Sequence, residues 1–315
     1  MSTFLNILKN SILRLRNYSL QTVKSKVNCN KILKFKNFKE YQDGSIEYIF
    51  GFHSVNIALQ SKKRLFYRIF VKNDIFNLPD SNKNTNFLEI YSIAKLNSVP
   101  IFPITLNALN KLVNFRSHQG IVLECSRLPF PLLDKIQVTE LLNGEQGTIV
   151  IVDDINIRFG VLLRTCAFFG VIGVIVPQMK FGIPFPVVSK MSSGSLEIIP
   201  MFRINNKIQT LRMLKEANCN IIGITDFLKP SHLETHTIES CTNYEINKIK
   251  KGHNVLVVMT EQCQLEDILS LCDVKLCISP SNLYETCGSD LSQSISVGII
   301  LNFIQCVKKY NKFMC

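Results

Sequence analysis

The sequence predicts an α/β protein in which a small α/β unit is followed by a larger unit built on a parallel sheet. Apolar runs of strand length alternate with segments of helix length, which is typical of α/β folds. In the second half, the apolar runs are uninterrupted, as in parallel strands that are buried on both faces. The chain has 315 residues, 46% hydrophobic and 19% charged, so it can bury a large core and is not disordered as a whole.

The small unit is expected over residues 45–127. Its predicted helices cover residues 55–60, 87–97 and 106–115, and its predicted strands cover residues 66–71, 99–102 and 120–125. Two prolines and a turn-rich stretch then mark a linker over residues 128–147.

The larger unit is expected over residues 148–315. Its predicted strands cover residues 148–152, 173–176, 220–224, 254–258 and 275–278, and its predicted helices cover residues 161–169, 207–217 and 294–308. Gly170 stands where a helix C-terminal glycine belongs. Ligands of such sheets bind beyond the carboxyl ends of the strands, but no loop there contains G-x-G-x-x-G or a P-loop. A Rossmann dinucleotide enzyme and a P-loop NTPase are therefore disfavoured.

The charge of the chain is concentrated at its N-terminus. The formal net charge is +12, yet residues 1–39 hold nine Lys and Arg and no acidic residue, so the remainder carries only +3. Residues 1–40 are basic, Ser- and Asn-containing, and amphipathic over 4–15, which predicts a mitochondrial presequence and a location in the matrix. The alternative is a basic arm that stays on the protein and contacts nucleic acid.

No membrane span and no metal site are expected. The most apolar stretch, residues 159–177, is interrupted by Arg164. Eleven cysteines form no C-x-x-C pair, and an odd number in a chain with a large core favours free thiols in a reducing compartment. His232 and His236 are one helical turn apart but lack the Glu position of H-E-x-x-H and a third ligand.

Several motifs occur in an order that resembles the SpoU branch of the SPOUT RNA methyltransferases. The first follows a strand and runs from Val152 through Asn156 and Gly160 to Arg164; the second is Ser189-Lys-Met-Ser-Ser-Gly-Ser-Leu-Glu197. The third combines Val258-Met-Thr-Glu261, Ile278-Ser-Pro280 and Leu291-Ser-Gln-Ser294. Upstream, Gly51-Phe-His53 and His118-Gln-Gly120 look like the two ends of that family's substrate-binding domain. The resemblance covers about residues 47–310 and is strongest to mitochondrial members.

The resemblance implies a C-terminal SPOUT domain, a parallel sheet threaded into a trefoil knot, which is a rare exception to unknotted chains. It implies a homodimer that uses S-adenosylmethionine to methylate a ribose 2′-OH in mitochondrial large-subunit ribosomal RNA. The implied catalytic residues are Arg164, Glu197 and Ser294, with Glu197 orienting Arg164 or a neighbouring loop. The implied cofactor-binding residues are Thr225, Met259, Glu261, Gln262, Ile278, Leu291 and Ser292. Because Arg164 lies within an apolar segment, an ordinary surface position is disfavoured for it.

This sequence departs from the family pattern in its cofactor loop. The family has Gly-x-Glu-Gly-x-Gly-Leu, whereas this chain has Met259-Thr-Glu-Gln262-Cys-Gln264-Leu and none of the three glycines. Glycine lets a backbone approach a ligand or adopt positive φ. The alternative hypothesis is therefore a catalytically inactive SPOUT-fold protein that binds RNA or acts in ribosome assembly.

RNA contacts are predicted at basic residues of both units. The candidates are Lys63, Arg64, Arg68, Arg116 and Arg158. Phe66 and Tyr67 are interleaved with the first three and could stack a splayed base. The alternative is a solvated charged face with both aromatic side chains buried in the sheet.

Overall fold

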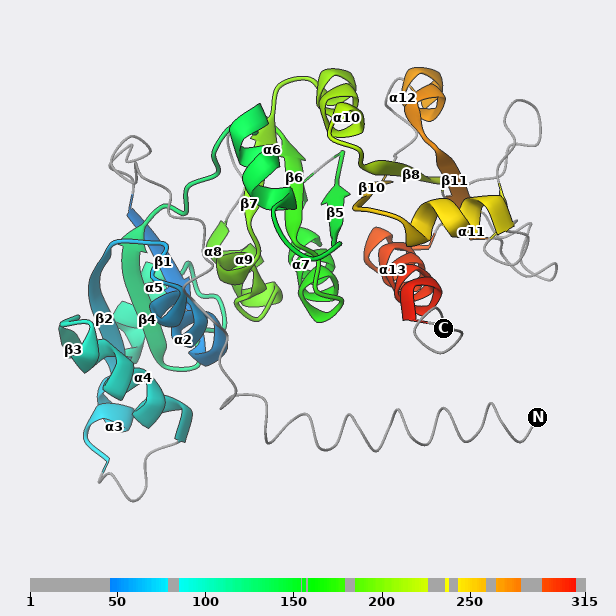
Figure 1. Ribbon diagram of the computed structural model, residues 1–315. Coiled ribbons are helices and arrows are strands. Elements are labelled where there is room, and N and C mark those ends of the chain that lie inside the picture. Colours follow the sequence, from blue (N-terminus) through cyan, green and yellow to red (C-terminus); the bar gives the residue numbers. More distant parts are fainter. Residues whose placement is uncertain are drawn as a thin grey trace, which may run out of the picture. The chain divides into compact units, whose positions relative to one another are not determined.

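The computed structural model describes residues 46–78, 85–153, 155–156, 158–178, 185–225, 236–237, 243–258, 265–278 and 291–309 (Figure 1). They form a four-stranded sheet with its helices, called here the small-sheet unit (residues 46–126), and a seven-stranded sheet with its helices, the large-sheet unit (residues 148–309). The predicted α/β class and the parallel second sheet are confirmed.

The small sheet has the strand order β1-β4-β2-β3. Its strands are β1 (Ile46–Phe50), β2 (Phe66–Lys72), β3 (Ile101–Ile104) and β4 (Ile121–Ser126). β4 pairs antiparallel with both β1 and β2, whereas β2 pairs parallel with β3. The side chains of β2 alternate, so Ile69 and Val71 are buried on one face while Arg68 and Phe70 belong to the other.

Helices cover both faces of the small sheet. The helices are α2 (Phe52–Ser61), α3 (Asn73–Phe76), α4 (Thr85–Leu96) and α5 (Leu106–Leu112). α2 and α4 pack on the Ile69 face and bury apolar side chains at helical spacing, such as Val55 and Leu59. α5, whose N-cap Thr105 accepts a hydrogen bond from the Ala108 N–H, buries Leu109 against the opposite face.

A capped helix lies within the segment that was predicted as a linker. α6 (Lys135–Leu142) begins at Asp134, whose side chain accepts from the Gln137 N–H while the Gln137 side chain accepts from the Asp134 N–H. This reciprocal pair satisfies two of the free N–H groups at a helix start. Leu132, just before it, forms a bridge with Arg203 of the large sheet.

The large sheet has the order β7-β6-β5-β10-β8-β11-β9, and every pairing is parallel. Its strands are β5 (Thr148–Ile151), β6 (Gly173–Pro177), β7 (Met201–Ile204), β8 (Asn220–Thr225), β9 (His236–Thr237), β10 (Asn254–Val258) and β11 (Val274–Cys277). β10 is inserted between β5 and β8, so its flanking strands are separated by much of the sequence.

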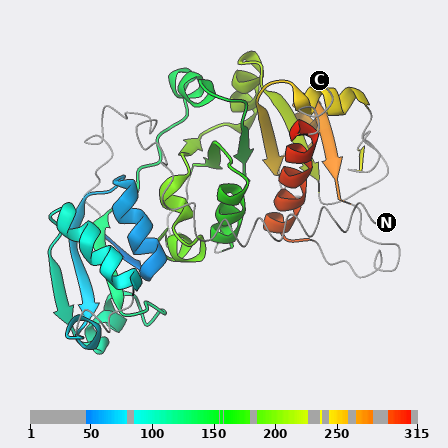
Figure 2. The same cartoon turned by 60° about the horizontal axis from the view of Figure 1, so that its bottom comes forward.

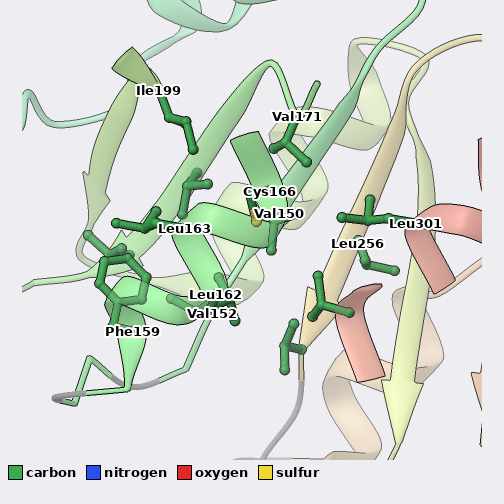
Figure 3. Close-up of a cluster of buried hydrophobic side chains, with 14 of the residues drawn as sticks. Val150, Val152, Phe159, Leu162, Leu163, Cys166, Val171, Ile199, Leu256 and Leu301 are labelled. Atoms are coloured by element: carbon green, nitrogen blue, oxygen red, sulfur yellow. The ribbon is translucent and has the colours of Figure 1, made fainter. Parts of the chain in front are cut away.

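Helices lie on both faces of the large sheet, as the uninterrupted apolar strands require. α7 (Phe159–Phe168), α8 (Phe185–Met191), α9 (Ser195–Ile198), α11 (Asn243–Lys250) and α13 (Gln293–Lys309) lie on one face, and α10 (Lys207–Glu216) and α12 (Leu265–Leu271) on the other (Figures 1 and 2). Figure 3 shows Leu162 and Cys166 of α7 beside Val150 of β5 in the core of the first face.

Most predicted elements are present, with ends shifted by a few residues. Nine of the described elements were not predicted: β1, β7, β9, α3, α6, α8, α9, α11 and α12. Each has eight residues or fewer, and the β7 sequence Met-Phe-Arg-Ile has no clean period. The predicted glycine at the end of α7 is confirmed, because Gly170 has a φ of +68°. The trefoil knot would pass through loops that follow β8, β10 and β11, and these lie outside the described residues.

The described cysteines agree with the predicted free thiols. Six of them are free, and burial raises the pKa of Cys125 and Cys166 to about 12. In the part of the chain that the structure describes, no helix is long and apolar enough to cross a membrane. The same residues contain no group of three potential metal ligands. His232 lies outside them.

Candidate functional site at the carboxyl edge of the large sheet

The predicted cofactor loops begin at three neighbouring strands. Val258, the last residue of β10, is registered with Ile224 of β8. Thr225, the next residue, is registered with Cys277 at the end of β11. The ends of these three strands therefore lie side by side at the carboxyl edge of the sheet, where ligands of parallel sheets bind.

The start of α7 lies at the same edge, after β5. The Asn156 side chain accepts a hydrogen bond from the Arg158 N–H at 2.8 Å, and its carbonyl accepts from the Phe159 N–H. Asn156 thus stabilises the turn into the helix and leaves Arg158 exposed at its N-terminus. A cationic side chain at this end can meet a phosphate group.

Gly160 lets α7 approach α8 closely. A Cβ atom at this position would lie 2.6 Å from Met191 Cβ and 2.8 Å from the Val188 carbonyl oxygen. The first-motif glycine therefore has a packing role that is visible in the structure.

Arg164 is exposed, so the expectation that it would not occupy an ordinary surface position is wrong. Leu163 and Cys166 are buried on the sheet side of α7, whereas Arg164 projects from the opposite side between the exposed Val161 and Phe168. At 100° per residue, adjacent positions need not share a face. Among the described residues, the Arg164 side chain has no hydrogen-bond or ion-pair partner.

α13 lies beside α7 and runs in the same direction. A Cβ atom at Gly298 would lie 3.3 Å from Thr165 Cγ2, and Gln305 donates a hydrogen bond to the Phe169 carbonyl at 2.8 Å. The start of α13 therefore lies toward the start of α7. This start carries Ser294, whose hydroxyl lies 3.2 Å from that of Ser292.

Four of the predicted cofactor-binding residues lie within the described part of the chain. Ile278 is half-buried and packs against the core beside the edge, while Leu291 is 38% exposed and Ser292 adds a hydroxyl. Apolar surface with a few polar groups is what such sites present. Thr225 lies at the edge through its backbone. Met259, Glu261 and Gln262 lie outside the described residues.

Glu197 does not orient Arg164; of the two roles expected for it, the structure shows contact with a loop, the one between α2 and β2, through Arg64. Its side chain is fully buried and accepts from Nε and Nη2 of Arg64, each at 2.9 Å. Ser189 donates a third hydrogen bond at 3.2 Å. A carboxylate that is saturated in this way is not available to substrate.

The same contact corrects the prediction that Arg64 binds RNA, because its side chain is also fully buried. The carboxylates of Glu197 and Glu47 raise the pKa of Arg64, although burial alone would lower it. Lys63 is also engaged: its ammonium donates to the Ile198 carbonyl at 2.8 Å, and burial lowers its pKa to about 8. Neither residue forms an open cationic patch.

Arg68, Arg116 and Arg158 are exposed. Arg68 pairs with Glu124 and lies over the Phe70 ring at 5.3 Å. Phe66 packs against the core, as the alternative of a buried aromatic side chain predicted, whereas Tyr67 is 42% exposed.

An open hollow of about 480 Å³ beside Arg68 was not predicted. It is lined by Ile46, Tyr67, Arg68, Pro100, Phe102 and Glu124. The run Tyr67-Arg68 was the available signal, but the hollow also needs residues from three other strands or their flanks, which spacing does not reveal.

Comparison with known proteins decides the family. The model of an RNA 2′-O ribose methyltransferase substrate-binding domain matches residues 48–131, and the SpoU rRNA methylase family model matches residues 147–285. A 23S rRNA (guanosine-2′-O-)-methyltransferase of Blochmanniella floridana is 30% identical over 183 residues, which cover 56% of this chain and 68% of that protein. The chain belongs to the SpoU rRNA methylase family. It is an RNA methyltransferase by this membership, as the sequence resemblance predicted.

Two further relatives bear on this SpoU protein. The mitochondrial rRNA methyltransferase 1 of Schizosaccharomyces pombe is 25% identical over 280 residues, which cover 81% of this chain and 88% of that protein. The AdoMet-bound rRNA methyltransferase of Sinorhizobium meliloti has the same fold, with a TM-score of 0.60 at 14% identity over 83% of this chain and 87% of that one. The predicted SPOUT fold is thereby confirmed.

Proposed function

We propose that this chain transfers a methyl group from S-adenosylmethionine to a ribose 2′-OH of mitochondrial large-subunit ribosomal RNA. The observation that carries the proposal is Arg164, an exposed guanidinium on α7 that has no partner among the described residues and follows the family's first motif. An arginine without an intramolecular partner is suited to a phosphate ligand, which it can bind through two parallel hydrogen bonds.

The residues of the carboxyl edge position RNA more than they perform proton chemistry. A ribose hydroxyl is a weak nucleophile, so holding its oxygen in line with the methyl group is a large part of the rate enhancement. Arg164 and Arg158 would hold phosphates on either side of the reacting ribose. A guanidinium keeps its protons in proteins, so Arg164 acts through charge and orientation rather than as a base. The Ser294 hydroxyl can accept a hydrogen bond from the 2′-OH or donate one to it.

S-adenosylmethionine supplies the methyl group as an activated sulfonium. Ile278 and Leu291 would contact its adenine, and Thr225 and Ser292 would contribute polar groups. The segment with Met259, Glu261 and Gln262 completes the expected site. This segment lacks the three glycines of the family pattern, which supports the alternative hypothesis of an inactive RNA-binding protein. The ligand test below distinguishes the two hypotheses.

Titration calorimetry with the purified chain tests the cofactor directly. Binding heat is expected at micromolar to millimolar S-adenosylmethionine, and no heat at millimolar ligand would favour the inactive RNA-binding protein. Mapping of 2′-O-methyl groups then tests the reaction. Arg164→Ala should abolish the modification while the protein keeps its affinity for S-adenosylmethionine, because α7 lies beside the cofactor edge but Arg164 faces outward. An unchanged modification level would contradict the role of Arg164.

We also propose that the protein is a homodimer, with the exposed face of α7 and α13 as its interface. Four large apolar side chains are exposed there: Val161, Phe168, Ile295 and Ile299. Such a patch on one face is typical of association surfaces. In sedimentation analysis, Phe168→Asp should give monomers. Leu96→Asp, at an 84% exposed leucine of α4, is the matched control and should leave the dimer intact.

Residues 1–40 are proposed to direct the protein to the mitochondrial matrix. The basic, acid-free composition supports this, and the fission-yeast relative is named as mitochondrial. A reporter fused to residues 1–40 should be imported into isolated mitochondria and protected from added protease. A variant with Arg14 and Arg16 changed to Glu should not.

A further inference from the structure

The second sequence motif lies where the large-sheet unit meets the small-sheet unit. Between Val187 and Ile199, its polar and apolar groups contact residues of the small-sheet unit at five separate points. α8 and α9, which carry most of these points, together have only eleven residues.

The centre of this contact is the bidentate pair between Arg64 and Glu197, whose side chains are both 0% exposed. The third guanidinium nitrogen, Nη1, donates to Glu47 at 2.6 Å and to the Ser126 carbonyl at 2.9 Å. Each nitrogen of the buried cation is therefore bonded, and the planar fork fixes the direction as well as the distance of Glu197.

Other contacts hold the same segment on either side of the ion pair. Ser54 of α2 donates to the Ser189 carbonyl at 3.0 Å, and Lys63 donates to the Ile198 carbonyl at 2.8 Å. Gly194 has a φ of +86°, and a Cβ there would lie 2.7 Å from Ile57 Cβ, so α2 lies directly against the turn before α9.

Apolar packing extends the contact to α8. Val187 and Met191 pack into the cluster of Phe50, Leu109 and Val113 on the second face of the small sheet. At the other side of α8, the Val188 carbonyl and Met191 Cβ contact Gly160 of α7. One short helix thus connects the small sheet to the helix that carries Arg164.

We propose that Arg64 and Glu197 form a positioning pair that clamps the small-sheet unit to α8 and α9 and thereby sets where RNA held by the small-sheet unit meets Arg164. The effect of the pair on catalysis rests on the proposed function, whereas the clamp between the two units does not. This pairing assigns the motif glutamate to domain geometry: its carboxylate acts through Arg64 and does not touch the substrate.

The clamp is tested first without substrate, by calorimetry of the full-length chain. The wild-type protein is expected to unfold its two sheets in one cooperative transition. Arg64→Met leaves a buried carboxylate without its partner and should separate the unfolding into two transitions. Glu197→Gln, which conserves volume, should also separate the two transitions, but by less. It provides a second test in case Arg64→Met fails to fold. In both variants, amides of α9 should exchange with solvent at least tenfold faster.

Arg68→Met is the matched control for these structural measurements. It removes an arginine that pairs with Glu124 inside the small sheet, so it should keep one transition and leave exchange in α9 unchanged. One transition and wild-type exchange in both Arg64→Met and Glu197→Gln would overturn the clamp.

The positioning role is tested by separating binding from turnover. In Arg64→Met, kcat should fall at least tenfold while the Kd values for RNA and for S-adenosylmethionine stay within twofold of wild type. Arg64→Lys keeps the charge on a single nitrogen, without the planar fork, and should recover part of kcat. Two transitions with wild-type kcat would overturn the positioning role. A wild-type chain that transfers no methyl group would refute the proposed function, yet the number of transitions would still decide the clamp.

Discussion

Replacing Gly160 with alanine should destabilise the protein and impair catalysis through one contact. The added Cβ would lie 2.6 Å from Met191 Cβ and 2.8 Å from the Val188 carbonyl oxygen, whereas ordinary contact begins at 3.4 Å, so α7 and α8 must separate by about 0.6–0.8 Å at this point. Both atoms are fixed by the backbone of α8 and cannot rotate away. Overpacking of this kind costs about 1–3 kcal/mol, and the better helix propensity of alanine offsets up to about 1 kcal/mol.

The expected net loss is about 1–2 kcal/mol, which corresponds to a Tm lower by roughly 2–8 °C for a domain of this size. Urea unfolding followed by circular dichroism measures the free energy. Gly144→Ala is the matched control, because no atom lies within 4 Å of a Cβ at that position, and it should stay within about 0.5 kcal/mol of wild type. Since α7 carries Arg164, kcat of Gly160→Ala should also fall by about tenfold. A Gly160→Ala protein as stable as Gly144→Ala would refute the reasoning.

Three further outcomes are expected. Burial lowers the pKa of the Lys63 ammonium to about 8, so between pH 8 and 10.5 the unfolded chain binds more protons than the folded one. The free energy of unfolding should therefore rise with pH over this range, by at most about 3 kcal/mol. Urea titrations at each pH should show this rise in the wild type and not in Lys63→Met. Cys166, whose pKa is raised to about 12, should stay unlabelled by iodoacetamide at pH 8 until urea unfolds the protein, and labelling at the rate of a free peptide thiol would contradict its burial. Arg164→Ala should change the free energy of unfolding by less than about 0.5 kcal/mol, because the side chain is exposed; a larger loss in the same urea assay would reveal an intramolecular partner.

The long elements were predictable because their signals are local. α7, α10 and α13 have apolar side chains at helical spacing, and β8 and β10 are uninterrupted apolar runs bounded by turn residues. β7 and α9 have four residues each, too few for a period to stand out. Arg164 shows the limit of reading neighbours along the chain: Leu163 and Cys166 near it are buried, but the helix turns Arg164 away from them.

The carboxyl edge of the large sheet was predictable from the sequence, but the contacts of Glu197 were not. The carboxyl edge follows from the parallel order of strands, and the order of motifs supplied Arg164 and Ser294. The partner of Glu197 could not be predicted, because Arg64 lies 133 residues away and nothing in the spacing of either residue marks the pairing. A basic run such as the one that includes Arg64 is equally compatible with a solvated face and with an RNA-binding surface. Only the fold shows that one of its members is buried.

This distinction changes how the motif residues should be tested. Loss of activity on mutating Glu197 has been expected from its place beside Arg164 in the motif order, but the structure gives a different cause for the same loss. If the Glu197 carboxylate took part in the reaction, replacing it would change kcat but would leave the two sheets unfolding in one transition. A carboxylate in a buried ion pair alters cooperativity first, since removing one partner leaves an uncompensated charge in the interior. Measurements of unfolding on Glu197→Gln therefore separate the two roles where measurements of activity alone cannot.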